Sequence, residues 1–197
     1  MPITMRHFSH TKSVQSVQSG ASLIEVLIAI LILSFGLLAM GGMLSWGVLM
    51  PKLASYRATA TNLASSHIDA IRANPFGFQS DWYNAALNET TGWSSNAIAL
   101  SGSNCSFTGT QCTAQTLAAA DTNIFRNAVR RDLPGGDIVV RCSTTPCTSA
   151  SYGELWVIWK EPSSAMDVSG SDDCPATAVS LYTTPKPRCL YVRFQIQ

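Results

Sequence analysis

Residues 21–50 form a long apolar run in which Glu25 is the only charged side chain. A helix that crosses the hydrocarbon core of a bilayer needs about twenty mostly apolar residues, so this run is long enough to span a membrane. The segment before it, residues 1–20, carries Arg6 and Lys12 and no acidic residue. A basic leader before an apolar helix keeps the N-terminus of the helix in the cytoplasm. The sequence therefore predicts a single-pass inner-membrane protein with its remaining chain in the periplasm or beyond.

Composition agrees with a membrane segment and argues against some partners. Only 13% of the residues are charged, about half the average for globular proteins. The apolar run is longer than the roughly 7–15 residues of a secretory signal, and no small-x-small pattern clearly ends it, so we expect it to be retained. The formal net charge of +1 gives no electrostatic reason to propose binding to nucleic acid.

A helical pattern continues beyond Pro51. Apolar side chains recur every three or four residues and alternate with polar ones, which is typical of an amphipathic helix. Asn74 and Pro75 end the pattern, because the residue before proline resists helical torsions. We expect one long helix over residues 21–74, weakened in its middle by Pro51 and several glycines. His67 lies near the apolar face and is predicted to be a packing residue rather than a metal ligand.

The 123 residues from 75 to 197 are enough for a separate core. Helical spacing predicts a second helix over residues 114–131, followed by the turn sequence Leu-Pro-Gly-Gly. Branched and aromatic residues predict three strands, over residues 137–142, 154–160 and 190–194. The expected fold class is α+β, in which a small antiparallel sheet packs one face against the long helix.

Two further features of this head concern exposed segments. Residues 92–116 are predicted to be mainly loop. Trp156 and Trp159 fall on opposite faces of their strand, which makes one of them a candidate for an exposed contact residue. Core or rim packing is the commoner reason for such a tryptophan, so both alternatives stay open at this point.

All six cysteines follow the apolar run, and an even number outside the cytoplasm indicates disulfides. Six cysteines allow fifteen connectivities, and the sequence does not choose among them. Proximity along the chain favours the pairs Cys105–Cys112, Cys142–Cys147 and Cys174–Cys189. Zinc is the weaker alternative because no Cys-x-x-Cys spacing occurs, so no metal site is predicted.

Catalytic patterns are missing from the head. Residues 75–197 contain no histidine, which rules out a Ser-His-Asp triad or a Cys-His pair there. Asp172 and Asp173 stand in a Ser/Gly-rich stretch and are expected to be a solvated loop, with weak calcium contact as the alternative. The glycine pairs match no phosphate-binding fingerprint. The chain is therefore predicted to be neither an enzyme nor a cofactor-binding protein.

The residues Gly20-Ala21-Ser22-Leu23-Ile24-Glu25-Val26-Leu27 resemble the type IV prepilin signature. In that family a prepilin peptidase/methyltransferase cuts after the glycine and methylates the new N-terminus. The resemblance implies cleavage between Gly20 and Ala21, N-methylation of Ala21, and retention of the apolar helix as the core of a fibre. A charged amine buried in a fibre needs an anion, which Glu25 of a neighbouring subunit would supply to set the subunit register.

Later segments, in order, resemble the PilV type of minor pilin. They are Tyr56-Arg57-Ala58, Leu63-Ala64, Asp69 to Asn74, Asp121, Leu133 to Gly136 and the strand around Trp156. The resemblance implies a low-abundance subunit that primes or modifies type IV pilus assembly and adhesion. Its implied partners are other minor pilins, the major pilin and the inner-membrane assembly platform, and its final location is the pilus at the cell surface. It also implies that the middle of the long helix melts inside the fibre.

The resemblance divides the chain into four segments. They are a cleaved leader (residues 1–20), a transmembrane half-helix (21–50), an amphipathic half-helix (51–74) and a periplasmic or extracellular head (75–197). The nearest alternative is a minor pseudopilin of a type II secretion system. A pilus-tip adhesin is a further alternative, although 123 residues leave little room for an inserted domain. A membrane-anchored periplasmic enzyme is the third, and the histidine-free head argues against it.

Overall fold

The computed structural model describes residues 20, 22–94, 96, 105, 112–161 and 172–196. The chain divides between Trp46 and Gly47 into two compact units. Helix α1 belongs to both units, and every other helix and strand lies in the second one.

Helix α1 comprises Leu23–Ala73, close to the predicted range. It begins where the backbone oxygen of Ser22 accepts hydrogen bonds from the amides of Glu25 and Val26, at 2.9 and 3.2 Å. It ends before Asn74, whose side chain caps the short helix α2, Pro75–Gln79. The expected stop at Asn74 and Pro75 is confirmed. Pro51 lies inside α1, and the single chain remains helical through the glycine-rich middle.

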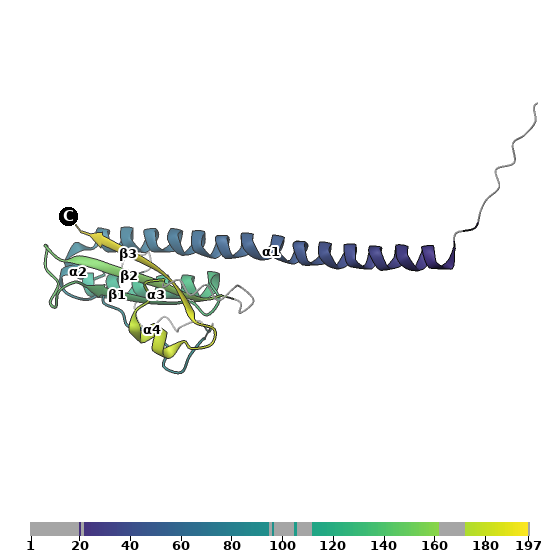
Figure 1. Ribbon diagram of the computed structural model, residues 1–197. Helices are drawn as coiled ribbons and strands as arrows, with labels where there is room; N and C mark the ends of the chain where they lie inside the picture. Colours follow the sequence, from purple (N-terminus) through teal and green to yellow (C-terminus); the bar gives the residue numbers. More distant parts are fainter. Residues whose placement is uncertain are drawn as a thin grey trace, which may run out of the picture. The chain divides into compact units, whose positions relative to one another are not determined.

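Three antiparallel strands in the order β1-β2-β3 form the sheet (Figure 1). They are β1 (Asp137–Cys142), β2 (Tyr152–Lys160) and β3 (Pro187–Gln195). The α+β fold expected from the sequence is therefore confirmed. Strands β2 and β3 are both longer than predicted. The start of β2 was not predicted because Gly153 has a low propensity for strands. The glycine leaves room for a neighbouring ring, since a Cβ there would lie 2.2 Å from Cζ of Phe194.

The inner face of the sheet is covered by α1 and by α3, which comprises Ala114–Asp132. The α1 side chains buried there follow helical spacing: Ala60, Ala64, His67, Ile68 and Ile71. They pack with Phe125 and Val129 of α3 and with Leu155, Val157 and Trp159 of β2. Helix α3 matches its predicted range to within one residue. The predicted loop before it lies mostly outside the described residues.

The outer face carries a second, smaller core. Helix α4 (Ala176–Leu181), which the sequence analysis did not predict, covers part of this face together with Trp93 and Leu87. Trp156 belongs to this cluster and Trp159 to the inner one, so the two tryptophans do lie on opposite faces. Both are buried, at 9% and 1% exposure, so neither is an exposed contact residue. Trp156 packs within this outer cluster, and its indole N–H donates to the carbonyl of Asp173 at 2.7 Å, just before α4.

Candidate functional site

The N-terminal segment around Gly20 places two features of the sequence close to one another in the chain. Gly20 is exposed and lies before the helix, and Glu25 lies in the first turn of α1. A Cβ at Gly20 would meet no atom within 4 Å, so no contact within the described chain requires glycine here. The dipole of the helix favours an acid in its first turn. Ala21 lies outside the described residues.

The part of α1 in the first unit exposes apolar side chains on all sides. From Leu23 to Trp46 every residue is exposed, including Leu23 at 83% and Phe35 at 67%. A helix that is apolar all round is stable only where another apolar environment surrounds it. Among the described residues α1 is the one helix with the length and composition to cross a membrane. This helix is suited to a bilayer or to packing among similar helices.

The second unit contains a buried carboxylate, that of Asp137, which no sequence motif indicated. Asp137, the first residue of β1, is fully buried. Its Oδ2 accepts hydrogen bonds from the amides of Asn88 and Glu89, at 3.0 and 3.3 Å, and from the hydroxyl of Tyr182 at 3.2 Å. Burial, followed by the charge of Asp137, raises the pKa of the Tyr182 phenol above its ordinary value. Asp137 thus ties the loop after α2 to β1 and to the end of α4.

Two arginines of α3 hold the same loop. Arg126 lies 3.5 Å from the carboxylate of Asp137 and donates to the carbonyl of Ala86 at 2.7 Å. Arg130 forms an ion pair with Glu89 and donates to the carbonyl of Asn96. Burial lowers the pKa of Arg126, and the charge of Asp137 opposes that shift. The two arginines are thus paired with the two carboxylates, and the cluster links α3, β1 and the loop after α2.

The end of α1 joins the head through a second polar group. His67 stacks on Phe125 with ring centroids 4.1 Å apart, as expected for a packing residue. The Tyr83 hydroxyl donates to Asp121 at 2.7 Å and accepts from the side chain of Asn74 at 3.3 Å. Burial, with the hydrogen bond to Asp121 next, raises the pKa of Tyr83. Asp121, one of the residues of the PilV-type resemblance, therefore has a structural contact here.

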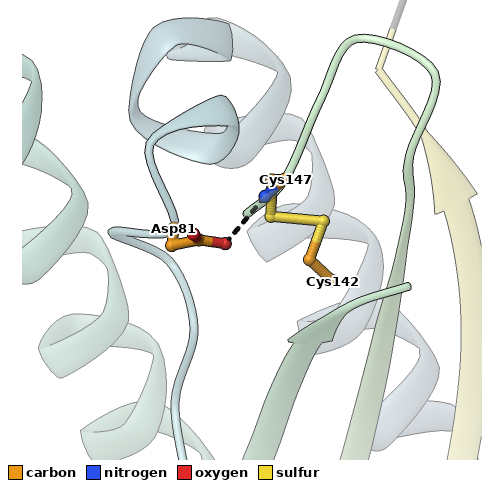
Figure 2. Close-up of side chains that lie close together, drawn as sticks. All are labelled: Asp81, Cys142 and Cys147. Atoms are coloured by element: carbon orange, nitrogen blue, oxygen red, sulfur yellow. Dashed lines mark hydrogen bonds between the residues drawn. A yellow bond between two sulfur atoms is a disulfide. The ribbon is translucent and has the colours of Figure 1, made fainter. Parts of the chain in front are cut away.

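Three disulfides join the pairs that proximity favoured: Cys105–Cys112, Cys142–Cys147 and Cys174–Cys189. Figure 2 shows Asp81 facing the Cys142–Cys147 disulfide. The two sulfurs and a carboxylate oxygen lie within 4.8 Å of one another, a spacing that suits a metal ion. The sulfurs, however, are bonded to each other and are not thiolate ligands. Asp81 accepts instead from the amide of Cys147 at 3.1 Å and from the side chain of Asn84 at 3.0 Å, which fixes the disulfide loop.

The acidic pair in the Ser/Gly-rich stretch is not a solvated loop throughout. The carboxylate of Asp172 lies 3.2 Å from Arg188 and 3.8 Å from Arg57 of α1, and it accepts from the amide of Cys189. Only Asp173 is exposed as expected. Because cations of the protein already neutralise Asp172, its surroundings do not favour calcium.

Comparison with known proteins concerns the N-terminal segment. Residues 15–41 match the family described as Prokaryotic N-terminal methylation motif. No curated protein and no solved structure matched the chain in the corresponding comparisons. The match covers Gly20, Glu25 and α1 as far as Gly41.

The N-terminal motif and the fold of the second unit are both pilin-like. Residues 15–41 carry the type IV pilin-family signal, and the second unit has a pilin-like α+β fold in which a long helix packs on a small antiparallel sheet. The motif implies processing by prepilin peptidase. The apolar N-terminal helix fits a membrane-anchored subunit of this class.

Proposed function

We propose that this chain is a minor pilin that primes or modifies the assembly of a type IV pilus. The observation that carries the proposal is the methylation motif over residues 15–41, placed directly on a helix that exposes apolar side chains on all sides. Such a helix is of use to a subunit that leaves the bilayer only to pack against similar helices, since both surroundings are apolar.

Processing begins at the exposed segment before α1. Prepilin peptidase cuts between Gly20 and Ala21 on the cytoplasmic side and methylates the amine of Ala21. The open space around Gly20 supports this step. Since no contact of the described chain needs a glycine there, we assign the need for glycine to recognition by the peptidase. The leader, residues 1–20, remains in the cytoplasm.

Assembly then uses the new N-terminus. A positively charged amine enters an apolar fibre core, where an unpaired charge is costly. Glu25 in the first helical turn of the neighbouring subunit, which is staggered by about one turn, supplies the counter-charge and sets the register between the two helices. Because the helix passes from one apolar environment to another, its association rests on close packing of side chains rather than on their removal from water.

The finer assignment to the PilV type rests on the segments quoted from the sequence, and adhesion is the other role that this resemblance implies. The partners that we propose are other minor pilins, the major pilin and the inner-membrane assembly platform. The protein is proposed to begin in the inner membrane, with its head in the periplasm, and to end in the fibre. A minor pseudopilin of a type II secretion system is the second candidate, because it uses the same N-terminal motif.

Mass spectrometry of fibres sheared from the native cell tests the proposal. We expect fibres to contain this protein with an N-terminal peptide that begins at methylated Ala21. The substitution Gly20→Val should abolish cleavage without disturbing the fold, since a Cβ at this position has open space around it. Ser22→Ala is the matched control and should be processed normally. Glu25→Ala should be cleaved but depleted from the fibres.

The outcomes separate the alternatives. A peptide that begins at Ala21 in membranes but is missing from fibres would favour the pseudopilin. An intact leader in both fractions would overturn the pilin proposal.

A further inference from the structure

One half of the outer sheet face is not covered by α4 and carries an arginine on each side of a glutamate. Residues Arg141, Glu154 and Arg193 lie directly opposite one another on β1, β2 and β3. Arg141 and Arg193 are exposed, whereas the glutamate between them is only partly exposed. The row therefore presents two positive charges and one negative charge across the sheet.

Glu154 in this row already interacts with two residues of β3. Its carboxylate accepts from the hydroxyl of Tyr191 at 2.7 Å and lies 3.6 Å from Arg193 of β3. Arg141 of β1 instead lies over the ring of Trp156, 5.8 Å from its centroid, and none of the described carboxylates forms an ion pair with it. The free charge of this surface is thus the guanidinium of Arg141.

The aromatic side chains of this surface are held in place by their neighbours. Arg193 lies 4.1 Å above the ring of Tyr152, and Tyr191 stacks on Trp156 at 5.0 Å. Arginine and tyrosine, which this surface exposes at least in part, are among the residue types enriched at the energetic centres of protein interfaces. Their fixed positions lower the entropic cost of binding.

We propose that this sheet face, defined by Arg141, Tyr152, Glu154, Tyr191 and Arg193, docks the head of a different subunit of the same assembly. The partner presents a carboxylate that pairs with Arg141. The charges of Arg193, Glu154, Arg141 and this carboxylate then alternate in sign. This inference rests on the proposed function for the class of partner. The carboxylate of the partner is inferred from Arg141, which forms no ion pair with a described carboxylate.

Two other classes of ligand fit the surface less well. A sugar or a base would need an open ring face for stacking, but Arg193 covers a face of Tyr152 and Tyr191 covers a face of Trp156. A nucleic acid would need several free cations, and among the residues that the structure describes this face offers only Arg141 without an ion pair. A protein carboxylate needs only the single guanidinium.

Site-specific photocrosslinking in the native cell tests the docking surface. A photoreactive phenylalanine replaces Tyr152 in the full-length chain, and a second version carries it at Ile124 of α3, which is 60% exposed. We expect the probe at position 152 to capture another protein that carries an N-terminal methylation motif. The probe at position 124 should not capture that protein.

Charge reversal then tests the role of Arg141. Arg141→Glu should reduce the crosslink at position 152 at least about tenfold, because like charges across an interface are strongly unfavourable. Arg141→Lys should retain most of it. Arg131→Glu is the matched control, since Arg131 is an exposed arginine on α3 whose side chain is 75% accessible. This variant should leave the crosslink unchanged.

Several results would overturn the inference. They are a crosslink that survives Arg141→Glu, an equal loss with Arg131→Glu, or capture only of a second copy of this chain. The N-terminal peptide is read in the same samples. If Ala21 is the first residue and the crosslink is absent, the inferred docking surface is wrong while the proposed function stands. If the leader is intact, the proposed function itself is wrong.

Discussion

His67 is surrounded by aromatic rings and by a cation. It is 3% exposed, stacks on Phe125, and lies 6.1 Å from the ring of Tyr83. Its Nε2 has no hydrogen-bond partner among the described residues. Burial, reinforced by the charge of Arg126, lowers the pKa of His67 from 6.5 to about 3. The side chain is therefore neutral in the folded protein at any pH near neutrality.

This environment predicts a pH-dependent stability. Between pH 6.5 and pH 3 the unfolded chain binds a proton at His67 and the folded chain does not. The free energy of unfolding is thus fully retained above pH 6.5 and falls by up to about 1.4 kcal/mol per pH unit below it. Urea unfolding of the full chain in detergent should show a loss of about 2 kcal/mol from this residue between pH 7 and pH 5.

The variant His67→Phe is the control for that measurement. A phenylalanine keeps the stacking on Phe125 but cannot bind a proton, so the part of the slope caused by His67 should disappear. Equal slopes for the two proteins between pH 7 and pH 5 would contradict the assigned environment.

Residues of this kind differ in how far the sequence predicts them. His67 is predictable as a packing residue, because it falls on the apolar face of a helical pattern. The burial of Asp137 is not predictable, because its hydrogen-bond donors Asn88 and Glu89 are 49 and 48 residues away in the sequence. These hydrogen bonds form only when the chain folds. The nearest sequence signal is an acid at the first position of an apolar strand, and that pattern is common at exposed strand ends.

The turn between α3 and β1 depends on two glycines that have different roles. Gly135 has a positive φ of 61°, which glycine adopts at little cost. Gly136 is required by space, since a Cβ there would lie 2.4 Å from the backbone oxygen of Val129. The last turn of α3 therefore packs directly against the start of β1.

We expect Gly136→Ala to lower the free energy of unfolding by about 1–3 kcal/mol, because the backbone of Val129 has to move. Gly47→Ala is the matched control. A Cβ at Gly47 has open space around it within α1, and replacing a helical glycine by alanine stabilises a helix by up to about 1 kcal/mol. Denaturant unfolding of both variants in detergent measures the difference. A Gly136→Ala protein as stable as the parent would show that the turn tolerates displacement.

Elements with a strong local pattern are predictable, and short ones are not. Helix α3 repeats apolar residues at helical spacing over 19 residues, and its observed bounds agree with the predicted ones. Helix α4 has six residues and no side-chain cap. It is helical because Ala178 and Tyr182 pack on the outer sheet face, a contact that the local sequence does not reveal.

At the scale of the whole molecule, three disulfides divide the second unit into locally closed loops. Their sequence separations are 7, 5 and 15 residues for Cys105–Cys112, Cys142–Cys147 and Cys174–Cys189. Closing a longer loop removes more entropy from the unfolded chain. The Cys174–Cys189 disulfide, which joins the segment before α4 to β3, should therefore contribute the most to stability.

Replacing both members of this pair by alanine should lower the free energy of unfolding by about 3 kcal/mol. The double variant Cys142→Ala/Cys147→Ala is the control with the shorter loop and should lose about 1 kcal/mol less. Thermal or urea unfolding of the full chain under non-reducing conditions compares the two. The reverse order of stability would mean that native contacts, rather than loop length, decide the contribution of each disulfide.

The sequence by itself determined the features that depend on neighbouring residues. The apolar run with Glu25, the motif around Gly20, the long helix and the α+β class all follow from local composition and periodicity, which act over a few residues. Cysteine pairing also followed proximity. Only the tertiary structure decided which charges meet. The partners of Asp137, the burial of both tryptophans and the position of Arg141 over Trp156 depend on segments brought together from different parts of the chain.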